Sequence, residues 1–211
     1  MLTAIIDYES GNLHSAEKAF QRMARETGAG QVVVTADADV VARADRLVLP
    51  GDGAFPACAR ALRGASGIYD AMVHAVEAQG RPFLGICVGM QLMARIGHEY
   101  EEAPGLGWID GEVTRITPSD PALKVPHMGW NEVWHHGEHP LWRDIPDGDR
   151  FYFVHSYHAV PADPALVAAR TDYGKPVVAM AGRGHVYATQ FHPEKSQAHG
   201  LQILKNFAAL N

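Results

Sequence analysis

The first half of the chain alternates short apolar runs with segments whose apolar residues recur every three or four positions. The runs at residues 2–7, 31–35, 45–49 and 82–86 have the length and composition of buried strands. Helical periodicity occurs at residues 12–27, 38–44, 57–62, 68–78 and 88–96. Strands that alternate with helices predict a parallel sheet covered by helices on its faces.

From about Gly111 the pattern changes to strands without helices between them, at residues 112–116, 131–134, 150–155, 166–171, 176–180 and 185–191. Such a series favours antiparallel pairing, and a last helix is expected at residues 197–210. No linker-like segment divides the chain. We therefore predict one α/β domain over residues 1–211, with a mostly parallel central sheet flanked by helices and additional antiparallel strands in the second half.

Charge and composition exclude several classes of function. The net charge is -6, from 18 basic and 24 acidic side chains without a long run of Lys or Arg, so binding to nucleic acid is not expected. No apolar run is long enough to span a bilayer, and the first residues lack the basic start of a signal peptide. With only Cys58 and Cys87, no disulfide framework can form. We expect a cytoplasmic protein without a membrane partner.

A cysteine stands between two glycines in residues 83–91, FLGICVGMQ, where a predicted strand meets a predicted helix. This is the nucleophile-elbow layout, in which glycines permit a sharp turn that lifts the nucleophile out of the sheet. A helix that begins at Val88 would place Cys87 at its positive end, which favours the reactive thiolate. The alternative is that Cys87 is a small buried apolar residue.

A cysteine nucleophile needs a base, and the strongest candidate among the 12 histidines ends an apolar run in ATQFHPE, residues 188–194. In an extended chain His192 and Glu194 face the same way, so the carboxylate can orient the imidazole. Alone, His192 would more often be an ordinary histidine at the end of a strand. With Glu194 and the elbow, a Cys-His-Glu triad is the better interpretation.

The reaction of such a triad also needs donors for an oxyanion. The backbone N–H of Val88 is one expected donor. The second is expected in the turn LPGDG, residues 49–53, at Asp52, although this turn is equally compatible with an ordinary strand-to-helix connection.

One motif is rejected. Residues 135–139, HHGEH, match the letters of a zinc-protease motif, but Gly137 and Pro140 favour a loop over the helix that this chemistry requires. Nothing else in the chain calls for a metal, and neither a P-loop nor a dinucleotide fingerprint is present, so no cofactor is expected.

The stretches FLGICVGMQ and QFHPEKS resemble the triad, or class I, glutamine amidotransferases. In this family a cysteine attacks the side-chain amide of glutamine and releases ammonia, and Cys87, His192 and Glu194 match its nucleophile, base and orienting acid. The resemblance implies a glutamine hydrolase with the α/β fold of this family.

Further segments narrow the resemblance to the glutaminase subunits of imidazole glycerol phosphate synthases, which act in histidine biosynthesis. These segments cover essentially the whole chain: IDY and GNL (6–8 and 11–13), LPG and GAF (49–51 and 53–55), KVPHMGWN (124–131), YFVHSY (152–157) and HPEKS (192–196).

This resemblance implies roles for residues outside the triad. The glutamine substrate would be bound by Gln91, Glu99, His155, Ser156 and Tyr157. A separate synthase, or cyclase, subunit with a (β/α)₈-barrel fold would form a heterodimer with this chain and receive the ammonia. The residues on motifs that face this subunit are Asn12, Trp130 and Lys195, for which a helix cap, core packing and a solvated charge are the respective alternatives.

Two positions depart from the family pattern. Asp52 replaces a valine, and a carboxylate near a developing oxyanion would oppose it unless the side chain points away. Residues 9 and 10, Glu and Ser, stand where glycine and methionine are commoner. Two other functions remain open: a stand-alone cysteine hydrolase such as a peptidase, and a regulatory or scaffolding subunit that does not use its triad.

Overall fold

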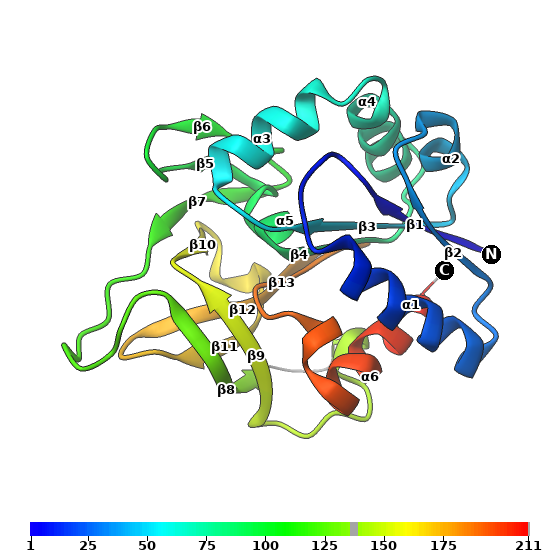
Figure 1. Ribbon diagram of the computed structural model, residues 1–211. Coiled ribbons are helices and arrows are strands. Elements are labelled where there is room, and N and C mark those ends of the chain that lie inside the picture. Colours follow the sequence, from blue (N-terminus) through cyan, green and yellow to red (C-terminus); the bar gives the residue numbers. More distant parts are fainter. Residues whose placement is uncertain (136–138, 211) are drawn as a thin grey trace.

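The computed structural model describes residues 1–135 and 139–210 (Figure 1). A nine-stranded mixed sheet crosses the molecule. Its strands in spatial order are β2 (Gln31–Thr35), β1 (Leu2–Ile6), β3 (Arg46–Gly51), β4 (Phe83–Cys87), β13 (Val186–Thr189), β12 (Pro176–Arg183), β11 (Val167–Asp172), β8 (His127–His135) and β9 (Asp149–His155). The α/β fold expected from the sequence is therefore present.

The first five strands in this order pair in parallel, and the other pairings are antiparallel. The strand β13 differs from the expectation for the second half, because it pairs in parallel with β4, with Thr189 beside Ile86. Its other neighbour, β12, is antiparallel. This strand thus joins the two halves of the sheet, and it brings the end of the chain next to Cys87.

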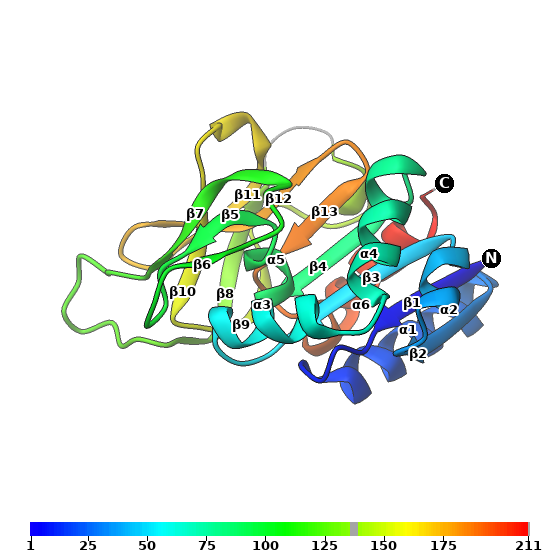
Figure 2. The same cartoon turned by 90° about the horizontal axis from the view of Figure 1, so that it is seen from above.

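Helices cover both faces of the parallel half (Figures 1 and 2). The helices α2 (Ala38–Arg43), α3 (Phe55–Gly64) and α4 (Ile68–Val73) lie on one face, and α1 (Leu13–Thr27) and α6 (Gln197–Ala208) on the other. The residues of β3 and β4 are all buried, as expected for strands covered on both faces. Within the described residues, no helix has the length and apolar character needed to cross a membrane.

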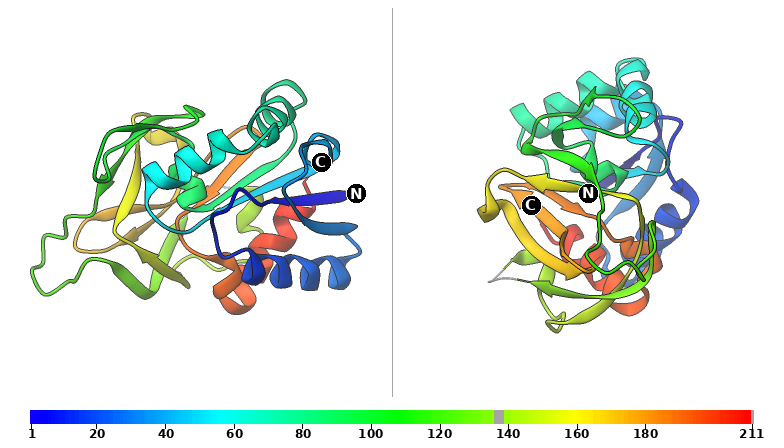
Figure 3. Two further views of the ribbon diagram at one scale, coloured as in Figure 1. Left: turned by 45° about the horizontal axis from the view of Figure 1, so that its top comes forward. Right: turned by 90° about the vertical axis from the view of Figure 1, so that its left-hand side faces the viewer.

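A second, four-stranded sheet lies at the end of the molecule away from the termini (Figure 3). Its order is β10 (Tyr157–Pro161), β7 (Ile109–Arg115), β5 (Ala94–Gly97) and β6 (Ala103–Pro104). The remaining elements are a π-turn, η1 (His74–Ala78), and three short 3₁₀ helices, η2 (Pro140–Trp142), η3 (Pro164–Leu166) and η4 (Pro193–Lys195).

The expected helix over residues 88–96 is wrong. The helix α5 (Val88–Gln91) is a single turn, and residues 94–97 form β5 instead. Ala94 to Gly97 pair with β7, a partner distant in sequence whose contribution a local periodicity cannot reveal. The predicted helix at 68–78 likewise changes to the π-turn at His74, and β3 continues to Gly51, beyond the expected end at residue 49.

Glycines allow α5 to pack directly on the backbone of the sheet. A Cβ atom on Gly89 would lie 1.8 Å from the carbonyl oxygen of Leu49, and one on Gly51 would lie 2.6 Å from the amide nitrogen of Gly89. A Cβ on Gly85 would lie 2.7 Å from the Gly89 oxygen. No side chain fits at these positions, so they fix the separation between the turn after Cys87 and strands β3 and β4.

Replacing Gly89 with alanine should therefore be severely destabilising. We expect Gly89→Ala to lower the free energy of unfolding by about 3 kcal/mol or more, because the new methyl group must displace backbone. Gly64→Ala is the matched control, since its Cβ would meet nothing within 4 Å at an exposed helical position. It should stabilise by up to about 1 kcal/mol. Urea unfolding measures both, and equal effects would contradict this account of the packing.

Candidate active site

Cys87 lies at the last position of β4, where the chain turns into α5. Its backbone has φ 55° and ψ −110°, a region that non-glycine residues rarely occupy. The residue is only 4% exposed, and it lines a cavity of about 270 Å³. Strained backbone held by tight packing is a frequent property of functional positions, and it gives this turn the geometry of a nucleophile elbow.

His192 and Glu194 form a buried pair. The Nδ1 atom of His192 donates to Oε1 of Glu194 at 2.7 Å, and the two side chains are 5% and 3% exposed. The contact expected from the sequence is present, but the chain is not extended there, because residues 193–195 form η4. Among the described residues, neither Nε2 of His192 nor Oε2 of Glu194 has a hydrogen-bond partner.

The electrostatics of this pair favour a charged imidazole. Burial alone lowers the pKa of His192, but interactions with the thiolate of Cys87 and the carboxylate of Glu194 outweigh it and raise the pKa to about 10. A proton on His192 and a negative charge on the Cys87 sulfur therefore stabilise each other. This arrangement provides a nucleophile and a proton donor together.

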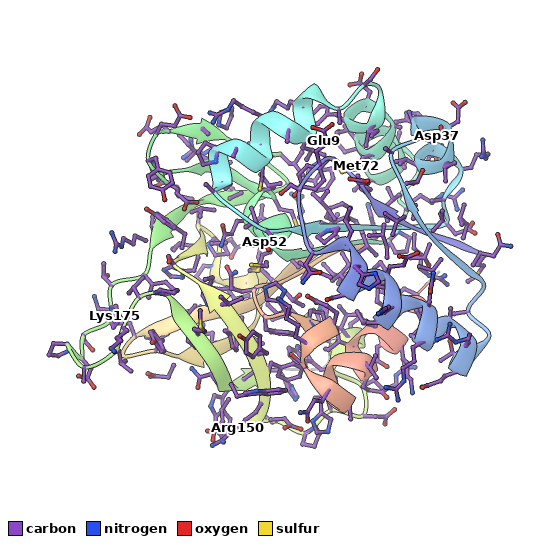
Figure 4. All side chains as sticks on the ribbon, in the orientation of Figure 1. Glu9, Asp37, Asp52, Met72, Arg150 and Lys175 are labelled. Carbon is purple, nitrogen blue, oxygen red and sulfur yellow. The ribbon has the colours of Figure 1, made fainter. Side chains whose placement is uncertain are left out.

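The turn at the end of β3 lies on the same cavity, which both Asp52 and Val88 line. The carbonyl oxygen of Asp52 accepts from Oγ of Ser10 at 2.9 Å, and the hydroxyl of Tyr8 donates to the oxygen of Pro50 at 3.0 Å. The turn is thus held by the loop after β1. Asp52, labelled in Figure 4, is an exposed residue, so water can solvate its carboxylate.

The structure brings the residues predicted to bind substrate to this cavity. Besides Cys87, Val88 and Asp52, the lining includes Gln91, Glu99, His155, Ser156 and Tyr157. Gly53, Pro126 and Val154 also line it and had not been predicted. A cavity with one acid, a few amide and hydroxyl groups and a thiol matches a small zwitterionic ligand.

Gln91 and Glu99 are also engaged within the protein. The Nε2 atom of Gln91 donates to the carbonyl oxygen of Tyr157 at 2.9 Å and to Oε1 of Gln190 at 3.2 Å, so its own oxygen is the atom left for a ligand. One oxygen of Glu99 accepts from the backbone N–H of Phe55 at 2.7 Å. Since Ala54 offers no side-chain cap, Glu99 satisfies the first N–H of α3.

Two histidines beside the cavity have defined tautomers. His155 lies 2.9 Å through Nδ1 from the oxygen of Tyr157, which can only accept, so Nδ1 carries the proton. Burial lowers the pKa of His155 to about 3 and that of His127 to about 4, so both rings are neutral. Nδ1 of His127 therefore donates to Nε2 of His155 at 3.0 Å, and Asn131 donates to Nε2 of His127 at 3.2 Å.

The residues predicted to contact a partner lie on three elements. The side chain of Asn12 accepts from the N–H of Ser15 at 3.3 Å, so it caps α1. Trp130 is 44% exposed and packs edge-to-face on Tyr152, with ring centroids 6.1 Å apart. The ammonium group of Lys195 lies 6.0 Å from the centre of the same ring. Trp130 and Lys195 thus share one surface cluster around Tyr152, and Trp130 is not a core residue.

The metal motif rejected from the sequence spans residues 135–139, and its central residues 136–138 lie outside the described part of the chain. Among the described residues, no group of three or more His, Cys, Asp and Glu side chains is placed to hold a metal ion.

Sequence analysis missed Gln190 and His127. Gln190 is fully buried, and its Nε2 lies 3.7 Å from the Cys87 sulfur. It stands two residues before His192, so the alternation that pointed to Glu194 could also have indicated Gln190. His127 offered no comparable signal, because its partner His155 is far away in sequence.

Almost the whole chain matches a known family. Residues 4–210 match the family described as "Glutamine amidotransferase class-I". Two solved structures share the fold over nearly the full length. One is a glutamine amidotransferase, with TM-score 0.72 and 18% identity over 98% of this chain and 99% of that one. The other is a putative GMP synthase protein from Thermoplasma acidophilum, with TM-score 0.68 and 22% identity over 99% and 92%. The fold and the site are those of a class I glutamine amidotransferase, an enzyme class.

Curated relatives are much closer in sequence. The imidazole glycerol phosphate synthase subunit HisH of Ruegeria pomeroyi is 70% identical over 98% of both chains, and that of Cereibacter sphaeroides is 60% identical over the same shares. The subunit HisH of Rhodospirillum rubrum is 54% identical, again over 98% of each chain. This chain belongs to the HisH family of class I glutamine amidotransferases.

The neutral histidine pair predicts a pH-dependent stability. An unfolded histidine binds a proton below about pH 6.5, whereas folded His127 and His155 stay neutral down to about pH 4 and pH 3, so acid favours unfolding. Between pH 6.5 and pH 5 each ring should cost about 2 kcal/mol of unfolding free energy. His192 adds nothing in this window, because it is protonated there in the folded state. Urea unfolding at both pH values should show a loss smaller by about 2 kcal/mol in His127→Phe, and an equal loss would refute the assignment.

Proposed function

We propose that the whole chain, residues 1–211, acts as one glutaminase domain that hydrolyses glutamine to glutamate and ammonia through a cysteine thioester. The observation that carries this proposal is the buried His192–Glu194 pair, at 2.7 Å, whose elevated pKa depends on Cys87 at the elbow. The family supports it, because the relatives are class I glutamine amidotransferases by family and HisH subunits by name.

The first half-reaction forms the thioester. The Cys87 thiolate attacks the side-chain carbonyl carbon of glutamine, and backbone N–H groups of Val88 and Asp52 donate to the resulting oxyanion. His192, oriented by Glu194, then gives its proton to the departing nitrogen, so ammonia leaves. A γ-glutamyl thioester and a neutral imidazole remain.

The second half-reaction restores the enzyme. Neutral His192 takes a proton from water as the water oxygen attacks the thioester carbon, and the carbon–sulfur bond then breaks to release glutamate and the thiolate. In the cavity, Glu99 receives the α-ammonium group of glutamine. Gln91 and the segment His155, Ser156 and Tyr157 hold the rest of its amino-acid end.

The ammonia is delivered to a partner. The relatives are named as subunits of imidazole glycerol phosphate synthase, and each aligns with this chain over 98% of its length. We propose that this chain forms a heterodimer with a synthase subunit of (β/α)₈-barrel fold in cytoplasmic histidine biosynthesis. Asn12, Trp130 and Lys195 would face that subunit, and the exposed side chains of Met128, Trp130 and Trp134 on β8 support a contact there.

Removing the thiol should abolish the reaction. Cys87→Ala is expected to lower glutamate release by about 10³-fold or more, because no other group can form the acyl intermediate. Glutamate is measured in a coupled assay with the synthase subunit present, and the thermal unfolding midpoint verifies that the variant is folded. Full glutamine hydrolysis by this variant would disprove the mechanism. Turnover of peptides instead of free glutamine by the wild type would favour the peptidase alternative.

The partner should stimulate the reaction, because ammonia released without an acceptor is wasted. We expect the synthase subunit with its ribonucleotide ligand to raise glutamate release by at least about tenfold, the effect of about 1.4 kcal/mol on the barrier. Trp130→Ala should weaken binding to the partner, as measured by calorimetry. Val160→Ala is the control, since Val160 is also 44% exposed but lies on the other sheet. Equal rates with and without partner would exclude this coupling, and no turnover in either case would favour a scaffolding role.

A further inference from the structure

Gln190 lies beside the nucleophile because of the register of the sheet. The strand β13 pairs in parallel with β4, with Thr189 next to Ile86, so the following residues, Gln190 and Cys87, are neighbours at the carboxyl ends of the two strands. Gln190 is completely buried, and its backbone N–H donates to Ala179 at 2.9 Å. Its side chain is therefore held in place on a rigid part of the fold.

Hydrogen bonds determine which way the Gln190 amide points. The Tyr157 carbonyl can only accept, so the Gln91 atom that lies 2.9 Å from it is the nitrogen. This nitrogen also donates to a Gln190 atom 3.2 Å away, which must therefore be the oxygen. The NH₂ group of Gln190 is consequently the part that faces the sulfur of Cys87, at 3.7 Å.

The thiolate needs such a donor. The helix that follows Cys87 is a single turn, so its positive end contributes less than a long helix would. The residue is only 4% exposed, and water therefore offers the sulfur little solvation. Hydrogen bonds to a charged acceptor are stronger than those to a neutral one, so an N–H aimed at the sulfur favours the thiolate over the thiol.

We infer that Gln190 is a further catalytic residue: its side-chain N–H donates to the Cys87 sulfur and stabilises the thiolate, both as attacking group and as the group released from the thioester. The inference rests on the proposed glutaminase function. It makes Gln91 a positioning residue as well as a substrate contact, because Gln91 holds the orientation of the Gln190 amide.

Two substitutions test the donor. Gln190→Met removes all polar atoms at similar size, and Gln190→Glu keeps an oxygen for Gln91 but places no N–H at the sulfur. The readout is the rate of alkylation of Cys87 by iodoacetamide against pH, followed by mass spectrometry of the peptide that contains Cys87. In both variants the pH midpoint of alkylation should rise by about one unit or more, and kcat for glutamine should fall about tenfold while KM changes little.

Thr189→Val is the matched control. Thr189 is the adjacent residue and is equally buried, and its hydroxyl has no hydrogen-bond partner in the described part of the chain. The isosteric valine should leave the midpoint at the wild-type value.

Other charged and titratable groups near the sulfur are unchanged in these variants. They are His192 and Glu194 after β13, Asp52 and Cys58 from the β3–α3 segment, Glu99 at the cavity, and Tyr8. His155 also lines the cavity and is neutral. The midpoint belongs to the coupled Cys87–His192 pair, so only its difference from wild type reports on Gln190.

A wild-type midpoint in a folded Gln190→Met or Gln190→Glu chain would overturn the inference. If neither variant folds, the wild-type chain labelled with ¹⁵N in its glutamine side chains serves instead. Alkylation of Cys87 should shift the NH₂ signals of Gln190, and unshifted signals would overturn the inference. A wild type that alkylates at Cys87 but does not hydrolyse glutamine with its partner would refute the proposed function, while the midpoints would still decide the role of Gln190.

Discussion

The direct contact between the turn of α5 and the backbone of β3 is the constraint on which the site depends. Gly51, Gly85 and Gly89 leave no room for a Cβ atom, so the chain can turn only in one way after β4. The result is the strained backbone of Cys87, with φ 55°. Because the same contact joins β3 to α5, the two proposed oxyanion donors, at Asp52 and Val88, lie on one cavity with the sulfur.

The electrostatic design of the site uses burial in two opposite ways. Around His192, two negative groups overcome burial and keep the imidazole charged. Around His127 and His155, burial prevails, and the rings remain neutral members of a one-way series of hydrogen bonds that ends at the Tyr157 oxygen. The same oxygen accepts from Gln91, so the neutral network supports the side of the cavity opposite to the charge.

The sequence predicts the sheet, most helices and the contact of His192 with Glu194, because these follow from local periodicity and spacing. It does not predict the end of α5, since residues 94–97 pair with a strand further along the chain. It also does not predict that β13 lies parallel to β4, and the position of Gln190 follows from that pairing. What was missed therefore depends on pairing between distant segments, whereas what was predicted depends on neighbours in sequence.

The position of β13 has a consequence for the order in which the site is completed during synthesis. The nucleophile is at position 87, whereas the histidine, the glutamate and the buried amide beside the sulfur all follow β13, between positions 190 and 194. A growing chain that has already formed β1 to β4 has its thiol, but it lacks the groups that ionise it. Only the insertion of β13 between β4 and β12 turns a folded half-sheet into a reactive centre, so incomplete chains carry an unactivated cysteine.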